Sequence, residues 1–189
     1  MQMLKLLGTL TLVCGLAAST AAALPAAQER RSAVPRTGLF VVGKSLAGVS
    51  LGHTPEQVRK RLGSNFVVCP QDVCKDKKQT WLYYLPADPS RLRLDPVASP
   101  VGMAVRFKNN KAYAVFTLGA VLGWKSSQGI KVSDPTSRIY EFYGNTATTD
   151  CIGYQALSLR TGSNVSSFYL TGGVVYGFAL TAPGVPVCQ

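Results

Sequence analysis

Few side chains of this 189-residue sequence could work together in acid–base or nucleophilic chemistry. The single histidine is His53, and catalysis of that kind needs a base placed close to a nucleophile. The nine acidic residues are scattered without a paired spacing. His53 itself falls at a predicted helix start, where it would cap the helix or face solvent. We therefore expect a protein that is not an enzyme.

A second pattern, Gly38–Ser45, matches the phosphate-binding motif G-x-x-x-x-G-K-[ST] letter for letter. That motif needs a strand before it and a helix opening at the lysine, so that backbone amides converge on the phosphates. Here a segment containing Arg and Pro precedes the match, its own apolar run resembles a strand, and Gly48 would interrupt a following helix. We expect neither nucleotide binding nor any other cofactor.

The N-terminus has the features of an export signal. Lys5 is followed by an apolar stretch over 6–16 and by Ala21-Ala22-Ala23, which suits signal peptidase, so residues 1–23 are predicted to be removed. A lipid anchor is disfavoured because Val13 precedes Cys14. No later apolar run reaches the roughly 18 to 20 residues of a membrane-spanning helix. We expect a secreted protein, or one of the periplasm or cell envelope, without a transmembrane segment.

Removal of this signal leaves four of the five cysteines, which in an oxidising compartment most simply form two disulfides. The sequence alone allows three pairings. We favour Cys69 with Cys74 and Cys151 with Cys188, because each pair then falls within one copy of an internal repeat. A zinc site built from the C-x-x-x-x-C spacing and His53 lacks a fourth ligand nearby, so we expect no metal.

The repeat appears as two self-matches. Residues 48–63 align with 129–144, and both segments contain a helix start, apolar residues four apart and a final glycine. Residues 105–113 align with 168–176, and both contain the chemistry of a two-residue hairpin turn, Asn-Asn or Gly-Gly. One further strand in each copy makes a helix followed by three strands.

These matches predict an α+β fold of two tandem helix-plus-three-strand units, with antiparallel sheets and the helices on one face. The expected organisation is a flexible tether over 24–37, a first unit over 38–122 with an inserted loop over 86–100, and a second unit over 123–189.

The motif of the first copy is Gly48-Val49-Ser50-Leu51-Gly52, then Thr54, Gln57-Val58 and Leu62-Gly63, followed by Trp81 and Tyr83 on a strand and by Val105 and Phe107 before a hairpin. It resembles the SmpA/OmlA (BamE) domain of outer-membrane assembly lipoproteins. The same unit in tandem, secreted and with one disulfide per copy, is similar to the β-lactamase inhibitory proteins. The resemblance covers about Gly43 to the end of the chain and implies non-enzymatic protein binding or scaffolding. His53 stands where the family often has Met, and the second copy lacks the counterparts of Gln57 and the tryptophan.

Positive charge is concentrated in the first unit. Residues 38–122 hold 12 basic and 5 acidic residues, whereas residues 123–189 hold 4 and 3. A cationic surface of this kind attracts anionic partners over a distance. The residues predicted to bind anions are Arg59, Lys60, Arg61, Lys75, Lys77, Lys78, Arg106, Lys108 and Lys111. Nucleic acid is not expected as a partner, because no recognised module accompanies the charge and the compartment is wrong.

Strand alternation predicts which side chains of the hairpins face outward. In the first copy, a turn that pairs Lys108 with Lys111 and Arg106 with Tyr113 sends one set of residues to the core: Met103, Val105, Phe107, Ala112, Ala114 and Phe116. The same register in the second copy places Phe168, Leu170, Val175, Gly177 and Ala179 under the helix. It leaves Tyr169, Thr171, Val174, Tyr176 and Phe178 on the outer face.

Aromatic rings near cations are typical of protein interfaces. We therefore expect Tyr113, Tyr169, Tyr176 and Phe178 to bind another extracytoplasmic protein, which makes the chain an exported, non-catalytic scaffold or inhibitor-like module. The alternative for this face is that the tether, the other unit or the 86–100 loop packs against it. The alternative function is a cell-envelope protein that binds anionic polymer or lipid through the basic first unit.

Overall fold

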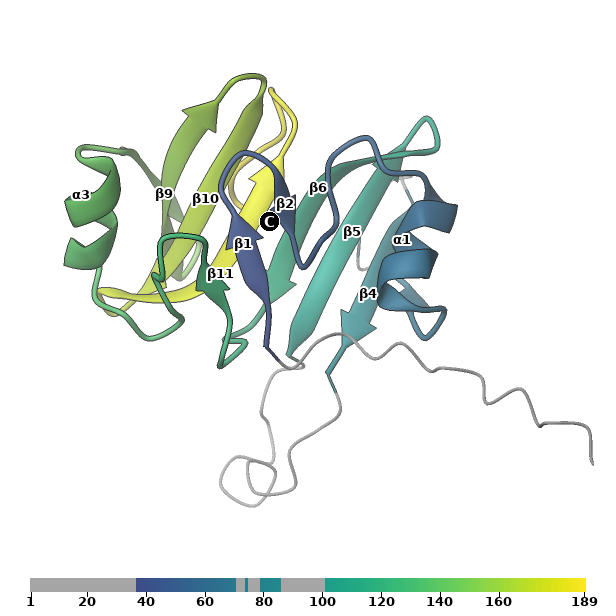
Figure 1. Ribbon diagram of the computed structural model, residues 1–189, viewed down its shortest axis with the longest axis horizontal. Helices are drawn as coiled ribbons and strands as arrows, with labels where there is room; N and C mark the ends of the chain where they lie inside the picture. Colours follow the sequence, from purple (N-terminus) through teal and green to yellow (C-terminus); the bar gives the residue numbers. More distant parts are fainter. Residues whose placement is uncertain (1–36, 71–73, 75–78, 86–100) are drawn as a thin grey trace, which may run out of the picture. The chain divides into compact units, whose positions relative to one another are not determined.

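The core of the protein is one antiparallel sheet of eight strands in the order β3-β4-β5-β6-β11-β10-β9-β8 (Figure 1). The computed structural model describes residues 37–70, 74, 79–85 and 101–189. The strands of this large sheet are β3 (Val67–Val68), β4 (Thr80–Tyr84), β5 (Gly102–Lys108), β6 (Lys111–Leu118), β8 (Ala147–Cys151), β9 (Tyr154–Thr161), β10 (Asn164–Thr171) and β11 (Val174–Thr181). Strands β6 and β11 pair in the middle, so the strands before and after Trp124 form the two halves of the sheet.

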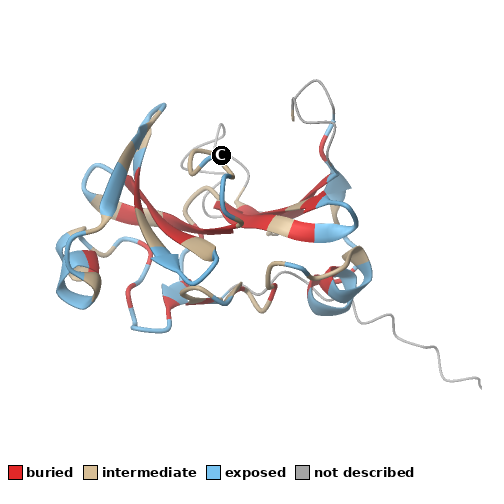
Figure 2. Cartoon of the chain, turned by 90° about the horizontal axis from the view of Figure 1, so that it is seen from above, coloured by how far each residue is buried: buried red, intermediate tan, exposed pale blue. Residues whose placement is uncertain are grey.

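Two helices and a small second sheet cover one face of the large sheet, which we call the helix face (Figure 2). The helices are α1 (Pro55–Leu62) and α3 (Ser137–Tyr143). The small sheet has the order β2-β1-β7 and consists of β1 (Leu39–Val41), β2 (Ser45–Leu46) and β7 (Lys125–Ser126). Because β1 and β7 pair in parallel, this sheet joins the start of the described chain to the segment between the two halves.

Helix α1 begins and ends at residues whose side chains or backbone suit helix caps. The Thr54 side chain accepts a hydrogen bond from the Gln57 amide, and the Gln57 side chain accepts one from the Thr54 amide, which is a capping box. Val58 and Leu62 are buried against the sheet, and Gly63 ends the helix at φ 85°. Helix α3 lies where the second copy of the motif predicts a helix, with Ile139 buried.

The predicted fold class is nevertheless wrong. The chain is mostly strand, its described helices have only eight and seven residues, and each half adds four strands to a single continuous sheet. The strands missed in the sequence are edge strands. Thus β8, the sequence Ala-Thr-Thr-Asp-Cys, is exposed along most of its length and has no apolar alternation to reveal it.

The Gly38–Ser45 motif forms the β1–β2 hairpin. The Lys44 amide donates to the Val41 carbonyl at 2.9 Å, and Gly43 takes the positive φ of 75° that the turn requires. A strand, and not a helix, therefore follows the lysine. The predicted signal peptide over 1–23, most of the tether over 24–37 and the loop over 86–100 lie outside the described residues.

Two β-bulges change the predicted faces. In the first hairpin Lys108 pairs with Lys111 and Phe107 with Ala112 as expected, but Arg106 pairs with Ala114, so Tyr113 is an extra residue. One extra residue reverses the alternation beyond it. Ala114 and Phe116 therefore pack in the cluster on the opposite face of the sheet, and their predicted place in the core under the helices is wrong.

The second hairpin has the same irregularity. Tyr169 pairs with Gly177 and Leu170 with Val175, so Tyr176 is the extra residue. Phe178 turns into the helix-face core, where it is fully buried, and Ala179 turns to the opposite face. The prediction that Phe178 binds a partner on an outer surface is wrong.

Phe40 of β1 joins the small sheet to this core. Its ring lies 5.6 Å from that of Phe168 and 5.2 Å from that of Phe178, and the residue is fully buried. We expect Phe40→Ala to lower the free energy of unfolding by about 3–5 kcal/mol, because it removes a ring and leaves a cavity. Urea unfolding measures this. The neighbouring Leu39→Ala is the control, since Leu39 is 43% exposed, and an equal loss in both variants would contradict the role given to Phe40.

Candidate functional site

The structure brings the start of α1 against the first hairpin. The Gly52 amide donates to the Ala112 carbonyl at 2.8 Å, and the Ala112 amide donates to the His53 carbonyl at 2.8 Å. Figure 1 shows α1 beside the end of the sheet where β5 turns into β6. Two basic segments that are about fifty residues apart in the sequence therefore lie side by side at one end of the sheet.

We define the cationic surface as Arg59, Lys60 and Arg61 of α1 with Lys108 and Lys111 of the hairpin, all of which are exposed. Of the described residues before Trp124, seven are basic and Glu56 is the one acid. The last turn of α1 suits positive charge because the carbonyl end of a helix is partially negative. The Arg59 guanidinium also lies over the Trp81 ring, at 5.8 Å from its centroid.

Other predicted anion-binding residues are not part of this surface. Arg106 is half-buried on the opposite face, where Nη1 donates to Gln189 Oε1 at 2.7 Å and the guanidinium lies 5.1 Å from the Phe116 ring centroid. Arg106 is thus engaged with other parts of the protein, whereas Lys108 and Lys111 are exposed, so we do not count it in the cationic surface. Lys75, Lys77 and Lys78 lie outside the described residues.

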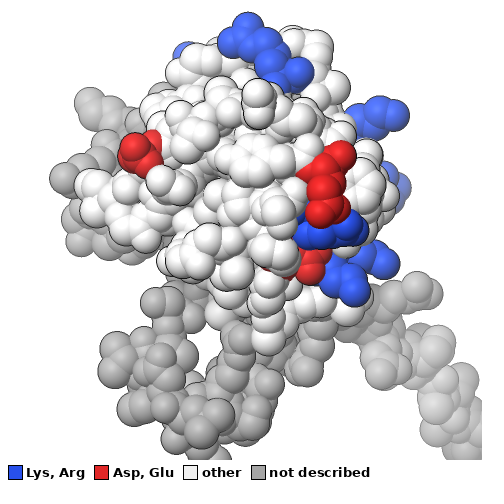
Figure 3. Space-filling model, turned by 90° about the vertical axis from the view of Figure 1, so that its left-hand side faces the viewer, with Lys and Arg blue, Asp and Glu red and all other residues white. Residues whose placement is uncertain are grey.

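The second half carries much less charge. Its described residues include four bases and three acids, and Arg138 and Glu141 of α3 form an ion pair with each other. Figure 3 views the molecule from the side of α3 and β9 and shows a few charges of both signs on a mainly uncharged surface. The charge asymmetry expected from the sequence is thus present on the folded surface.

A depression of about 380 Å³ opens on the cationic surface and is lined by His53, Gln57, Lys60 and Arg61. His53 is not the helix cap, since Thr54 has that role. Its Nδ1 accepts a hydrogen bond from the Ser50 amide at 3.4 Å. Burial lowers the pKa of His53 from its ordinary value, and the positive charge of Arg61 lowers it further. His53 and Gln57 were not predicted as site residues, although the i, i+4 spacing of 53, 57 and 61 could have indicated a shared helix side.

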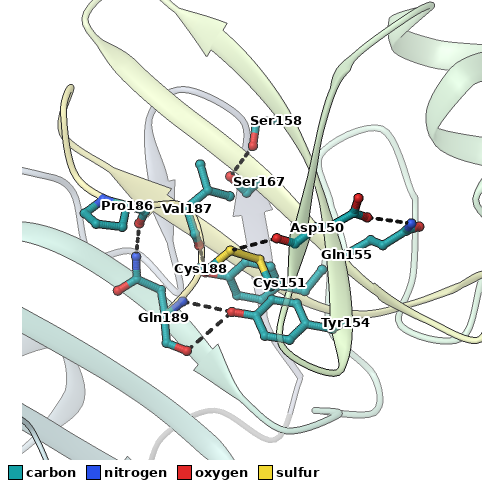
Figure 4. Close-up of a disulfide and its surroundings, with 11 residues drawn as sticks. Asp150, Cys151, Tyr154, Gln155, Ser158, Ser167, Pro186, Val187, Cys188 and Gln189 are labelled. Atoms are coloured by element: carbon teal, nitrogen blue, oxygen red, sulfur yellow. Dashed lines mark hydrogen bonds between the residues drawn. A yellow bond between two sulfur atoms is a disulfide. The ribbon is translucent and has the colours of Figure 1, made fainter.

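On the opposite face of the large sheet the aromatic residues of the second half gather into one cluster. The ring centroids of Tyr154 and Tyr169 are 5.3 Å apart, and those of Tyr169 and Tyr176 are 5.9 Å apart. Residues 182–189, which we call the cover segment, lie over this cluster with Val185 and Val187 packed against it. The Cys151–Cys188 disulfide ties the cover segment to β8 (Figure 4).

Hydrogen bonds hold the cover segment along its length. The Ala182 amide donates to the Tyr113 carbonyl at 2.8 Å, and the Tyr169 hydroxyl donates to the Val187 carbonyl at 3.0 Å. The Gln189 amide donates to the Tyr154 hydroxyl at 2.8 Å, as Figure 4 shows. These contacts place the end of the described chain on the aromatic face.

The cover segment removes most of the predicted aromatic docking surface. Tyr169 is only 2% exposed, while Tyr113 and Tyr176 are half-buried. Burial raises the pKa of Tyr169 well above 10, and the nearby Tyr154 and Tyr176 raise it further. The prediction of an open aromatic surface that includes Tyr169 is wrong. The covering residues are also not those considered from the sequence, because they come from the end of the second half.

Both disulfides connect described residues, Cys69 with Cys74 and Cys151 with Cys188, the pairs favoured from the sequence. Such bonds persist in oxidising compartments, so the protein is a secreted one. The described residues contain no group of three or more His, Cys, Asp or Glu side chains placed to hold a metal ion. Neither described helix is long and apolar enough to cross a membrane.

Comparisons with known proteins give no family. No family model matches the chain, and no curated protein matches it. Among solved structures it is similar to an extracellular protein containing an SCP domain from Bacillus anthracis str. Ames, with TM-score 0.45 and 9% identity over 70% of this chain and 44% of that one. It is also similar to a cysteine-rich secretory protein from Staphylococcus aureus subsp. aureus Mu50, with TM-score 0.43 and 12% identity over 70% of this chain and 43% of that one.

The chain thus spans less than half the length of each of these structures. No family model supports a BamE domain, and the described part of the chain is mostly strand with two short helices. The resemblance to the SmpA/OmlA domain and to the β-lactamase inhibitory proteins is therefore wrong.

The Cys151–Cys188 bond should control access to the aromatic cluster. We expect the double variant Cys151→Ser/Cys188→Ser to lose about 4 kcal/mol of unfolding free energy, since its loop is long, and Cys69→Ser/Cys74→Ser about 2 kcal/mol. Release of the cover segment should also let water reach Tyr169 and lower its pKa toward 10. Ultraviolet titration measures this, and an unchanged tyrosine titration in the first variant would contradict the covering role.

His53 should make stability depend on pH in the mildly acidic range. Its folded-state pKa is lower than the unfolded value near 6.5, so the unfolded chain binds a proton more readily. This contribution to the free energy of unfolding is complete above pH 6.5 and is lost as the pH falls through the folded pKa. Urea unfolding between pH 5 and 8 tests it with His53→Gln as the control, and identical pH profiles of the two proteins would refute it.

Proposed function

We propose that this secreted protein is a non-catalytic binding protein that holds an anionic polymer against its cationic surface. The observation that carries the proposal is the pair of hydrogen bonds between Ala112 and the Gly52–His53 segment, because they bring two groups of bases to one end of the sheet. Clustered positive side chains attract polyanions, and the attraction weakens as the salt concentration rises.

The polar tip of the first hairpin favours a polymer over a lipid surface. Asn109 and Asn110 occupy the turn with φ values of 51° and 59°, and both are exposed between Lys108 and Lys111. A segment that enters a membrane interface needs apolar residues at its tip to bury among the lipids. Anionic vesicles are accordingly an alternative to test and not the expected target.

Docking of a protein on the outer aromatic face has less support. It needs Tyr169 and Phe178 at the surface, and both are buried. Tyr113 and Tyr176 are half-buried under or beside the cover segment, so they offer only part of the area that an aromatic interface uses.

The proposal predicts a position-dependent loss of binding. We expect the full chain to bind fluorescent poly-L-glutamate or long-chain polyphosphate at low salt and to release either as salt rises. Lys108→Gln/Lys111→Gln should weaken binding about threefold to tenfold, since each exposed charge pair contributes roughly 0.2–1 kcal/mol. Fluorescence anisotropy gives the affinity.

The matched control is Lys125→Gln/Lys131→Gln, which removes two exposed lysines from the second half. It should change affinity by less than twofold. Equal losses in the two double variants would show that net charge alone matters, and would overturn the assignment to this surface. Salt-independent binding, or binding to anionic vesicles without binding to either polymer, would overturn the proposed function.

A further inference from the structure

The depression beside α1 has a chemical character that the rest of the cationic surface does not share. His53 comes from the loop before the helix, whereas Gln57, Lys60 and Arg61 come from one exposed side of α1. Residues three and four apart on a helix are neighbours on its surface, so these side chains reach the same opening.

The hydrogen-bonding groups that line this depression are mainly donors. Gln57 Oε1 already accepts the Thr54 amide proton at 2.8 Å, which leaves the Gln57 NH2 group to donate. His53 Nδ1 already accepts from the Ser50 amide, which leaves Nε2 as an N–H group. Lys60 and Arg61 have donors and no acceptors. A lining of this kind pairs with a ligand that is all acceptor.

We propose that this depression binds a single tetrahedral oxyanion, the phosphate or sulfate group of an anionic polymer, through His53, Gln57, Lys60 and Arg61. The inference rests on the proposed function, for which it names the group recognised. A tetrahedral oxyanion presents three or more acceptor oxygens in different directions and so suits donors from both the loop and the helix. A carboxylate has two oxygens in one plane, and the arginine fork alone would satisfy it.

The electrostatics agree with this assignment. The positive charge of Arg61 lies close enough to His53 to disfavour a second positive charge on its ring, in addition to the effect of burial. A bound oxyanion would offset that repulsion. Because His53 is the only histidine of the chain, its ring gives an isolated reporter at the site.

The test is a titration of the full chain with inorganic phosphate in which NMR monitors the signals of the His53 ring. Sodium chloride at matched ionic strength is the reference. We expect a saturable shift of the ring signals with phosphate and not with chloride. Lys60→Gln and Arg61→Gln should each weaken phosphate binding at least about fivefold. Arg61→Lys keeps the charge but loses the planar fork, so it should fall between Arg61→Gln and the unaltered protein.

Lys44→Gln is the control, because Lys44 is an exposed lysine of the first half in the β1–β2 turn, away from α1 in the sequence. It should change phosphate affinity by less than twofold. An equal loss with Lys44→Gln, a response to acetate as strong as that to phosphate, or no saturable shift would overturn the site.

The two proposals fail separately. Absence of a phosphate response while poly-L-glutamate still binds through Lys108 and Lys111 would overturn the oxyanion site alone. A saturable phosphate response in a protein that binds neither polymer would keep the site and overturn the function proposed for the surface.

Discussion

The pairing of β6 with β11 is the constraint on which the rest of the structure depends. It joins the two halves into one sheet through only three paired positions, between Ala114–Phe116 and Ala179–Thr181. Next to them the Thr117 hydroxyl takes the place of a backbone partner, since it accepts from the Phe178 amide at 3.0 Å. A Cβ atom on Gly177 would lie 2.3 Å from that hydroxyl oxygen. Glycine at this position therefore lets the strands approach closely enough for the side chain to continue the ladder.

This central pairing also decides which residues each face can bury. A continuous sheet has two faces to cover, and the two helices with the small sheet cover one of them. The opposite face is lined at its centre by small residues and aromatic rings, and the cover segment fills the aromatic part of it. The Cys151–Cys188 bond and the tyrosine hydroxyls thus complete the second layer, where a helix would otherwise be needed.

Local signals in the sequence were sufficient for the local structure. The capping box at Thr54 and the Asn109–Asn110 turn each depend on residues within a few positions, and both form as the pattern indicates. The bulges at Tyr113 and Tyr176 have no such signature, because an ordinary tyrosine supplies the extra residue. Each bulge reverses the faces beyond it, so Phe116 and Phe178 were assigned to the wrong side. The parallel pairing of β1 with β7 links residues more than eighty positions apart, and nothing local encodes it.

The candidate site likewise combines local features that the sequence reveals with long-range contacts that it does not. The bases of α1 and of the hairpin can be seen in the sequence, but their adjacency depends on the Ala112 hydrogen bonds, and the mainly donor lining depends on which acceptors the cap has already used.

Helix α3 shows that the fold does not require this charge. It precedes the four strands of the second half as α1 precedes those of the first, yet its one arginine is paired with Glu141 and lies over the Phe142 ring. Both helices bury an apolar side toward the sheet, Val58 and Leu62 in α1 and Ile139 in α3. Two helices in equivalent positions thus satisfy the same packing demand with very different exposed sides. Arg59 also lies over the Trp81 ring, but burial of the apolar side of α1 does not require three exposed bases, which is why we assign this charge to binding.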